Sequence, residues 1–313
     1  EQLALQVACV QQTLHPSIAS PYIVIFAADH GIAHENVSAY PREVTAQMVL
    51  NFARGGAAIN VFARQNTIGL RIVDAGVDYD FPSELDIVHA KIAHGTRNFL
   101  HEPAMTPEQC AQALECGSVI VQELHNTGCN AIGFGDMGIG NTTAASTLMH
   151  SITHIPLESC IGAGTGLTTQ HIQHKRFVIA SALARYNITA FSPEDILRHF
   201  GGFEIAMMCG AMLEAASRRM ILVIDGFITT AALLVAHAVH PHILHYCIFA
   251  HESDEHGHTI MLRYLNVEPL LRLGMRLGEG TGAALAFPLI QASVNILNEM
   301  ATFDSAHVSR YIL

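Results

Sequence analysis

The sequence predicts an α/β protein in which a parallel sheet is flanked by helices and accompanied by a smaller helical lobe. Apolar runs of strand length alternate with segments of helical spacing, which is typical of parallel βαβ units. The 313 residues are 50% hydrophobic and 14% charged, so the chain can bury a large core. We expect residues 20–270 to form the large α/β domain and residues 1–19 and 271–313 to form the lobe.

In the N-terminal half, the apolar run over residues 22–27 suits a central parallel strand. Asp29 and His30 follow this run at the point where open α/β sheets bind ligands, although both side chains are equally suited to shaping the turn. Helices are expected over 3–14, 43–50 and 57–64, a loop over 35–41, a second strand over 70–76 and an irregular polar segment over 78–106.

In the C-terminal half, Thr106-Pro107 and Ser192-Pro193 each place a capping residue before a proline and so predict helix starts. The apolar segment 220–239 has the length of a membrane span. Because Asp225-Gly226 divides it, we expect a buried strand and helix instead. The remaining elements are helices over 106–125, 144–149, 169–186, 205–216, from 229 and 283–297, and strands over 129–132, 221–224 and 246–250.

Charge and cysteine usage exclude some classes of protein. The formal net charge is −11, and no cluster of Lys or Arg is present, which argues against a nucleic-acid partner. Seven cysteines without a CxxC pair indicate reduced core residues of a cytoplasmic protein rather than a disulfide framework or a zinc site. No secretory leader or membrane anchor is visible, and because Glu1 is not an initiator methionine we expect the natural chain to begin earlier.

The most informative stretch, residues 133–143, reads Gly-Phe-Gly-Asp-Met-Gly-Ile-Gly-Asn-Thr-Thr after the apolar run 129–132. It predicts a strand, a tight glycine loop and a helix start, which together form an anion cradle suited to a phosphate. The dinucleotide and Walker A patterns fit only weakly, because Asn141 replaces the lysine of an ATPase and Glu158 is the one candidate for the fingerprint's acid. A second small-residue loop at 162–166 favours a shared phosphate site over a glycine turn without a ligand.

Other positions are candidates for binding and chemistry. Gln47 and Met48 fall near the strand-end crevice, and Met48 is either a core residue or a ligand contact. Lys175 is either a phosphate partner or a solvated surface lysine. Residues 251–258 hold three histidines and three acids without the spacing of a metal motif, so ligand contacts or a polar loop are favoured over a metal site. Glu279 stands among glycines and apolar residues, where a raised pKa would suit a general base or acid; the alternative is an exposed turn.

Together these stretches resemble the nicotinate-nucleotide:dimethylbenzimidazole phosphoribosyltransferase family, whose members make the lower-ligand nucleotide of cobalamin. The resemblance runs through nearly the whole chain in family order. The matching stretches are Ala28-Asp29-His30-Gly31, residues 37–41 and 43–48, Gly135 to Thr143, Gly202-Phe203-Glu204, Asp225-Gly226-Phe227 and Leu277 to Gly282.

The resemblance implies a Rossmann-like fold, a homodimer and a transferase. Such an enzyme moves phosphoribosyl from nicotinate mononucleotide to 5,6-dimethylbenzimidazole or a related base, and Glu279 would accept the benzimidazole proton. No metal or cofactor is implied, because the cationic pyridinium is already an activated leaving group and the protein mainly positions two substrates. By the family pattern, Tyr40, Gln47, Met48 and Leu277 line the base pocket, and Asp136, Met137, Gly138, Ile139, Gly140, Asn141, Thr142, Gly164, Lys175 and Ser253 hold phosphate and ribose.

This sequence departs from the family pattern at several points. Asp136 stands where glutamate is usual, Glu252 and His256 stand where arginine and proline are usual, and a Lys-Pro-Pro-Gly-Ser-Leu-Gly segment is absent. The altered loop and the missing segment favour an alternative, a non-catalytic nucleotide-binding protein derived from this family, whereas the presence of Glu279 favours the enzyme. A nicotinamide-dependent oxidoreductase is a third reading, but Asp74 lies in the wrong half of the fold to bind its ribose.

Overall fold

Six parallel strands form the main sheet of the computed structural model, which describes residues 1–162 and 169–309. In spatial order they are β3 (Val88–His89), β2 (Gly69–Gly76), β1 (Tyr22–Ala28), β4 (Ala131–Met137), β5 (Ile221–Ile224) and β6 (Cys247–Phe249). This arrangement confirms the predicted fold class. The strand order reverses between β1 and β4, and ligands bind at such a reversal in doubly wound sheets.

Successive side chains of β1 enter different cores because they point to opposite faces of the sheet. Val24 and Phe26 pack into one core, whereas Ile23 and Ile25 pack into the other. The first core is built with α4 (Pro107–Asn126), α5 (Asn141–Thr153), α8 (Pro193–Phe200), α9 (Phe203–Ser217) and α10 (Phe227–Val239). The second is built with α1 (Gln2–Gln11), α2 (Glu43–Ala53), α3 (Ala58–Gln65) and α12 (Thr281–Glu299).

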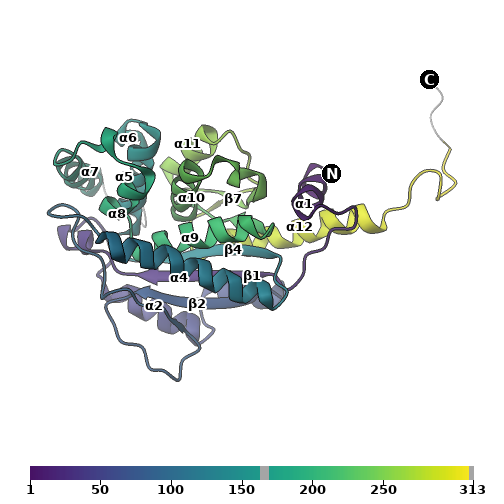
Figure 1. Ribbon diagram of the computed structural model, residues 1–313, viewed down its shortest axis with the longest axis horizontal. Coiled ribbons are helices and arrows are strands. Elements are labelled where there is room, and N and C mark those ends of the chain that lie inside the picture. The colour runs from purple at the N-terminus through teal and green to yellow at the C-terminus, as the bar shows by residue number, and fades with distance from the viewer. Residues whose placement is uncertain (163–168, 310–313) are drawn as a thin grey trace.

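Helices α1 and α12 lie side by side (Figure 1). They come from the two ends of the chain, from which a smaller lobe was expected, and the division into 20–270 against 1–19 and 271–313 stays a prediction. The remaining elements are α6 (Leu157–Cys160), α7 (Thr169–Leu183), α11 (His256–Tyr264), the short helices η1 (Gly31–Glu35), η2 (Ile188–Ala190) and η3 (Pro241–Tyr246), and a second parallel pair, β7 (His251–Ser253) with β8 (Leu271–Met275).

The helix starts at Thr106-Pro107 and Ser192-Pro193 and the division of the apolar segment were predicted correctly. The hydroxyls of Thr106 and Ser192 accept bonds from the backbone N–H groups of Gln109 and Asp195, so both residues cap their helices. The segment 220–239 forms β5 and α10, with its side chains almost wholly buried. Among the described residues, no helix is long and apolar enough to cross a membrane.

The sequence prediction was wrong about where β4 ends. We expected a strand over 129–132 followed by a glycine loop, but β4 continues to Met137 and contains Gly133 and Gly135. Gly135 is needed in the strand because a Cβ there would lie 2.5 Å from the carbonyl oxygen of Glu279. This glycine therefore lets the loop before α12 rest directly on the central sheet. Strands β3, β7 and β8 and helix α11 were not predicted.

Candidate active site

A cavity of about 380 Å³ opens at the carboxyl ends of the central strands. Residues from α2, from the β4–α5 and β5–α10 connections, from β7 and from the loop before α12 all border it. Its lining includes the connection after β4, one of the two strands at the strand-order reversal, where an open α/β sheet is expected to bind a ligand. Eleven expected site residues line it: Tyr40, Met48, Asp136, Met137, Gly138, Ile139, Asn141, Thr142, Ser253, Leu277 and Glu279.

The glycine loop is held in place before α5 begins. The hydroxyl of Thr45 accepts a hydrogen bond from the backbone N–H of Ile139 at 3.1 Å. Gly140 precedes α5 with φ near 99°, a conformation that favours glycine, and among the described residues no side chain caps this helix end. The positive end of the helix dipole thus faces the cavity.

Lys175 lies behind this loop and is 1% exposed, so the surface-lysine reading is wrong. Its Nζ donates to the hydroxyl of Thr142 at 2.9 Å. Burial lowers the pKa of Lys175 to about 8, against an opposing contribution from the Glu255 carboxylate. Lys175 does not itself line the cavity, but its ammonium group contacts Thr142, which does.

Glu279 lies at the centre of a loop with left-handed backbone. Gly278, Glu279 and Gly280 have φ values of 71°, 64° and 83°, and a glutamate in this region is strained. Its Oε2 accepts a bond of 3.4 Å from the backbone N–H of Ile59, in the first turn of α3. Burial raises the pKa of Glu279, the Ile59 bond opposes the rise, and the Asp225 charge adds to it. The expectation of a raised pKa is confirmed.

Two further carboxylates border the same space. Burial, followed by the charges of Asp225 and Glu204, raises the pKa of Asp136 to about 8, although Asn141 Nδ2 donates to its Oδ2 at 2.8 Å. Burial also raises the pKa of Asp225, whose Oδ1 accepts from the backbone N–H of Ala283 at 2.8 Å. The cavity therefore holds three carboxyl groups with raised pKa values, Asp136, Asp225 and Glu279, beside the glycine loop.

The apolar wall comes from Met48, Leu277 and Phe227, with Tyr40 at the rim. Tyr40 is 49% exposed and Leu277 is 57% exposed, so both stand at the open side of the cavity. Gln47 is exposed on α2 and does not line the cavity, so its part in base binding stays a prediction. Gly140 and Lys175 lie behind the lining, and Gly164 is outside the described residues.

Several lining residues were missed: Val44, Asp225, Gly226, Phe227, Ile228, His251, Glu255, Arg276 and Gly278. The sequence could have predicted Asp225 and Gly226 as lining residues, because both directly follow a buried strand. The departure at Glu252 does not bring a carboxylate into the cavity, because Glu252 accepts from Arg272 Nε at 3.2 Å and from the Thr259 hydroxyl at 3.0 Å. His256 begins α11 and does not line the cavity either.

Asp29 and His30 belong to neighbouring structures rather than to this cavity. His30 is fully buried, and its Nε2 pairs with Glu204 Oε1 at 2.6 Å. Asp29 accepts from the backbone N–H of Asp78 at 2.8 Å. For these two residues the turn-shaping interpretation is the better one.

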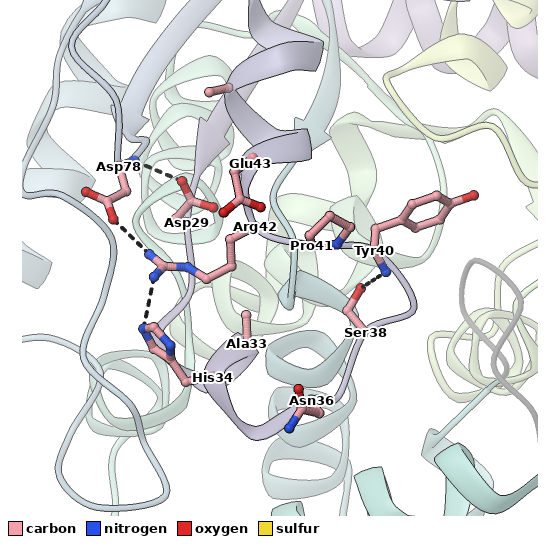
Figure 2. Close-up of a pocket in the computed structure, with 11 residues that line it drawn as sticks. Asp29, Ala33, His34, Asn36, Ser38, Tyr40, Pro41, Arg42, Glu43 and Asp78 are labelled. Carbon is pink, nitrogen blue, oxygen red and sulfur yellow. Dashed lines mark hydrogen bonds and ion pairs between the residues drawn. The ribbon is translucent and has the colours of Figure 1, made fainter.

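A second cavity of about 420 Å³ shares Tyr40 with the first. Figure 2 shows the Arg42 guanidinium between Asp78 and His34, at 3.1 Å and 2.9 Å. Asp29 and Glu43 also border this space. The second cavity has no glycine loop, its carboxylates would repel an anion, and the guanidinium of Arg42 is already paired. The first cavity is therefore the better candidate for an anionic ligand.

Within residues 1–162 and 169–309, no group of three or more His, Cys, Asp or Glu side chains is arranged to hold a metal ion. His251 and His258 are both buried, with ring centroids 6.2 Å apart. The seven cysteines are free, and five of them are buried.

Comparison with known proteins adds independent findings. A phosphoribosyltransferase family model matches residues 1–308. The chain is 55% identical over 312 residues to nicotinate-nucleotide–dimethylbenzimidazole phosphoribosyltransferase of Janthinobacterium sp. (strain Marseille), covering 99% of this chain and 90% of the relative. It is 56% identical over 309 residues to the protein of that name from Cupriavidus taiwanensis, covering 99% and 89%.

The fold has close solved counterparts. The crystal structure of CobT from Thermus thermophilus superposes with a TM-score of 0.96 at 41% identity, over 99% of this chain and 92% of the other. A structure of nicotinate-nucleotide–dimethylbenzimidazole phosphoribosyltransferase from the same organism gives a TM-score of 0.94 at 40% identity, with the same coverage.

Proposed function

This chain belongs to the family of nicotinate-nucleotide–dimethylbenzimidazole phosphoribosyltransferases, and we propose that it transfers phosphoribosyl from nicotinate mononucleotide to 5,6-dimethylbenzimidazole. One observation carries the proposal. A single cavity is lined by the half-buried Glu279, by apolar side chains and by the glycine loop that precedes a helix. A flat base and a phosphorylated sugar require these two surfaces side by side.

In this reaction a ring nitrogen of the benzimidazole donates its lone pair to C1′ of the ribose. The bond from C1′ to the pyridinium nitrogen breaks, and its electron pair stays with the ring, which leaves as nicotinate. The proton on the other benzimidazole nitrogen passes to the Glu279 carboxylate. The product is the α-riboside phosphate of the cobalamin lower ligand.

The residues divide between the two substrates. Tyr40, Met48 and Leu277 offer the base an apolar surface, and Gln47 is assigned to the base on resemblance alone. On the other side, the α5 dipole and the Lys175 charge attract the phosphate, which would in turn raise the Lys175 pKa. The remaining nucleotide contacts are assigned to Asp136, Met137, Gly138, Ile139, Gly140, Asn141, Thr142, Gly164 and Ser253.

The raised pKa values of the cavity carboxylates suit this substrate pair. A carboxylate whose pKa lies near working pH is an efficient general base, and such proton transfer contributes on the order of 10²–10⁴ in rate. Asp136 is held near its ionisation point without a ligand. The positive charge that develops on the ribose as the pyridinium ring leaves would favour the ionised form of Asp136, and an ionised carboxylate there would stabilise that charge.

Base-dependent release of nicotinate tests the proposal. The purified chain is incubated with nicotinate mononucleotide, with and without 5,6-dimethylbenzimidazole, and nicotinate and riboside phosphate are quantified chromatographically. We expect equimolar amounts of both products, formed only when the base is present. Release at the same rate without the base would indicate a hydrolase, and binding without release would indicate the non-catalytic alternative.

We also propose that the protein works as a cytoplasmic homodimer. Exposed apolar side chains gather on the adjacent helices α1 and α12, among them Leu5, Leu289 and Ile296, and such surfaces often mark protein contacts. Free cysteines suit a reducing compartment. Sedimentation equilibrium tests the dimer, and a monomer at micromolar concentration would refute it.

A further inference from the structure

His258 lies outside the cavity lining, yet it is fully buried and bonded through both ring nitrogens. Its Nδ1 accepts a hydrogen bond of 2.9 Å from the backbone N–H of Ser253, on β7. Its Nε2 lies 2.9 Å from the hydroxyl oxygen of Thr230, on α10. That hydroxyl is also 2.7 Å from the carbonyl oxygen of Gly226.

In this series of hydrogen bonds, the donor and the acceptor of each bond are fixed. A backbone N–H can only donate, so Nδ1 must be the unprotonated nitrogen and Nε2 must carry the hydrogen. Nε2–H then donates to Thr230, and the Thr230 hydroxyl donates to the Gly226 carbonyl. Burial, with the nearby His251 adding to it, lowers the pKa of His258 to about 3. The ring therefore stays neutral and keeps the same hydrogen-bond roles across the ordinary pH range.

The two ends of the chain are both cavity residues. Ser253 and Gly226 line the candidate active site from different elements, the first on β7 and the second at the start of α10. The ring bonds Ser253 directly and meets α10 at Thr230, whose own N–H and hydroxyl both bond the Gly226 carbonyl, so the ring ties β7 to the first turn of α10. An apolar side chain of the same size would fill the space but leave the buried Ser253 N–H unpaired, which is costly.

We propose that His258 is a positioning residue for the nucleotide subsite, and that it holds Ser253 by accepting the Ser253 backbone N–H. The inference rests on the proposed function insofar as it takes nicotinate mononucleotide as the occupant. His258 touches neither substrate. Its effect is to present Ser253 at the distance the nucleotide needs.

Two partial isosteres separate this role from simple space filling. His258→Asn keeps an oxygen where Nδ1 accepts from Ser253 but does not reach Thr230. His258→Gln keeps a donor where Nε2 reaches Thr230 but loses the acceptor for Ser253. We expect KM for nicotinate mononucleotide to rise about tenfold in His258→Gln and to stay within about twofold in His258→Asn.

In both variants we expect kcat, and KM for dimethylbenzimidazole, to stay within about twofold of the parent chain, because a remote binding group changes ground state and transition state alike. His242→Gln, an exposed histidine, is the matched control. Equal nucleotide KM values for the two His258 variants, with equal losses of thermal stability, would overturn the proposal in favour of a packing role.

If neither His258 variant folds, Thr230 decides. Thr230→Val and Thr230→Ser both leave the bond from the Ser253 N–H to Nδ1 intact, as His258→Asn does, so both should keep nucleotide KM within about twofold of the parent. A several-fold rise in Thr230→Val alone would show that the Thr230 contact, and not the Ser253 bond, positions the subsite, and would refute the proposal. Calorimetric titration with nicotinate mononucleotide alone measures the same order of affinities without turnover. If the nucleotide affinities of the variants follow the expected order but no variant and no parent protein releases nicotinate, the result would count against the proposed reaction and support the role of His258.

Discussion

Replacing Asp136 with asparagine should stabilise the protein at pH 8.5 and leave its stability unchanged near pH 4. Asn141 Nδ2 donates to Asp136 Oδ2, and the carboxamide oxygen of Asp136→Asn can accept the same bond. The pKa of Asp136 is raised from 3.8 to about 8, so the folded protein holds a proton that the unfolded chain releases between these values. Stability of the parent therefore falls as pH rises from about 4 to 8, and the variant lacks this fall.

The magnitude follows from the width of that interval. Each pKa unit is worth about 1.4 kcal/mol, which gives an upper limit of roughly 6 kcal/mol. Because the side chain borders an open cavity, water screens much of this, and we expect the variant to gain about 2 kcal/mol at pH 8.5. Urea unfolding of parent and variant at pH 4.5, 6.5 and 8.5 measures the difference directly.

The control for this experiment is Asp86→Asn, which removes an exposed carboxylate. Its stability difference from the parent should not change with pH by more than about 0.5 kcal/mol. A pH-independent difference for Asp136→Asn, or a loss of stability that grows with pH, would mean that Asp136 is already ionised at neutral pH in the folded protein.

Two other predictions concern the cavity. Gly135→Ala should lower kcat more than tenfold, because the added Cβ would displace the backbone of Glu279, the proposed base. Steady-state kinetics measure the loss, and thermal unfolding shows whether the variant is still folded at the assay temperature. In an Asp136→Asn background, where one group fewer titrates in this range, kcat/KM for the nucleotide should fall above about pH 8 as Lys175 loses its proton. Lys175→Met should lose most nucleotide affinity and the pH dependence together, whereas Arg176→Met, on the exposed side of the same helix, should keep both.

Most of the sheet could be predicted because its strands are buried on both faces. Continuous apolar runs predicted β1, β5 and β6, and the alternation with helices predicted β2. Asp225-Gly226 correctly separated a strand from a helix. The pair β7–β8 was missed because its residues are polar or exposed and only pairing across the chain makes them strands. Gly133 and Gly135 were assigned to a loop because the reason for glycine within β4 lies in α12 and the loop before it, far along the chain.

The site residues could be predicted where a short stretch of sequence alone marks them. The glycine loop and the isolated Glu279 stand out in the sequence, and the structure brings them to one cavity. The burial of Lys175 was not readable, since its helix is polar along the sequence and only packing beneath Thr142 buries it. His258 was part of a polar cluster with no distinguishing spacing, and its role depends on a hydrogen-bond chain to Thr230 on another helix.

In the proposed reaction Glu279 is the general base for transfer to the benzimidazole, and Glu279→Gln removes that base. The amide keeps the size of the side chain but cannot accept the proton. We predict that kcat for base-dependent nicotinate release falls by about 10²–10⁴, while KM for nicotinate mononucleotide changes by less than about threefold. Glu299→Gln, the same exchange at the exposed end of α12, should retain full activity. A Glu279→Gln enzyme that works within tenfold of the parent would contradict the account.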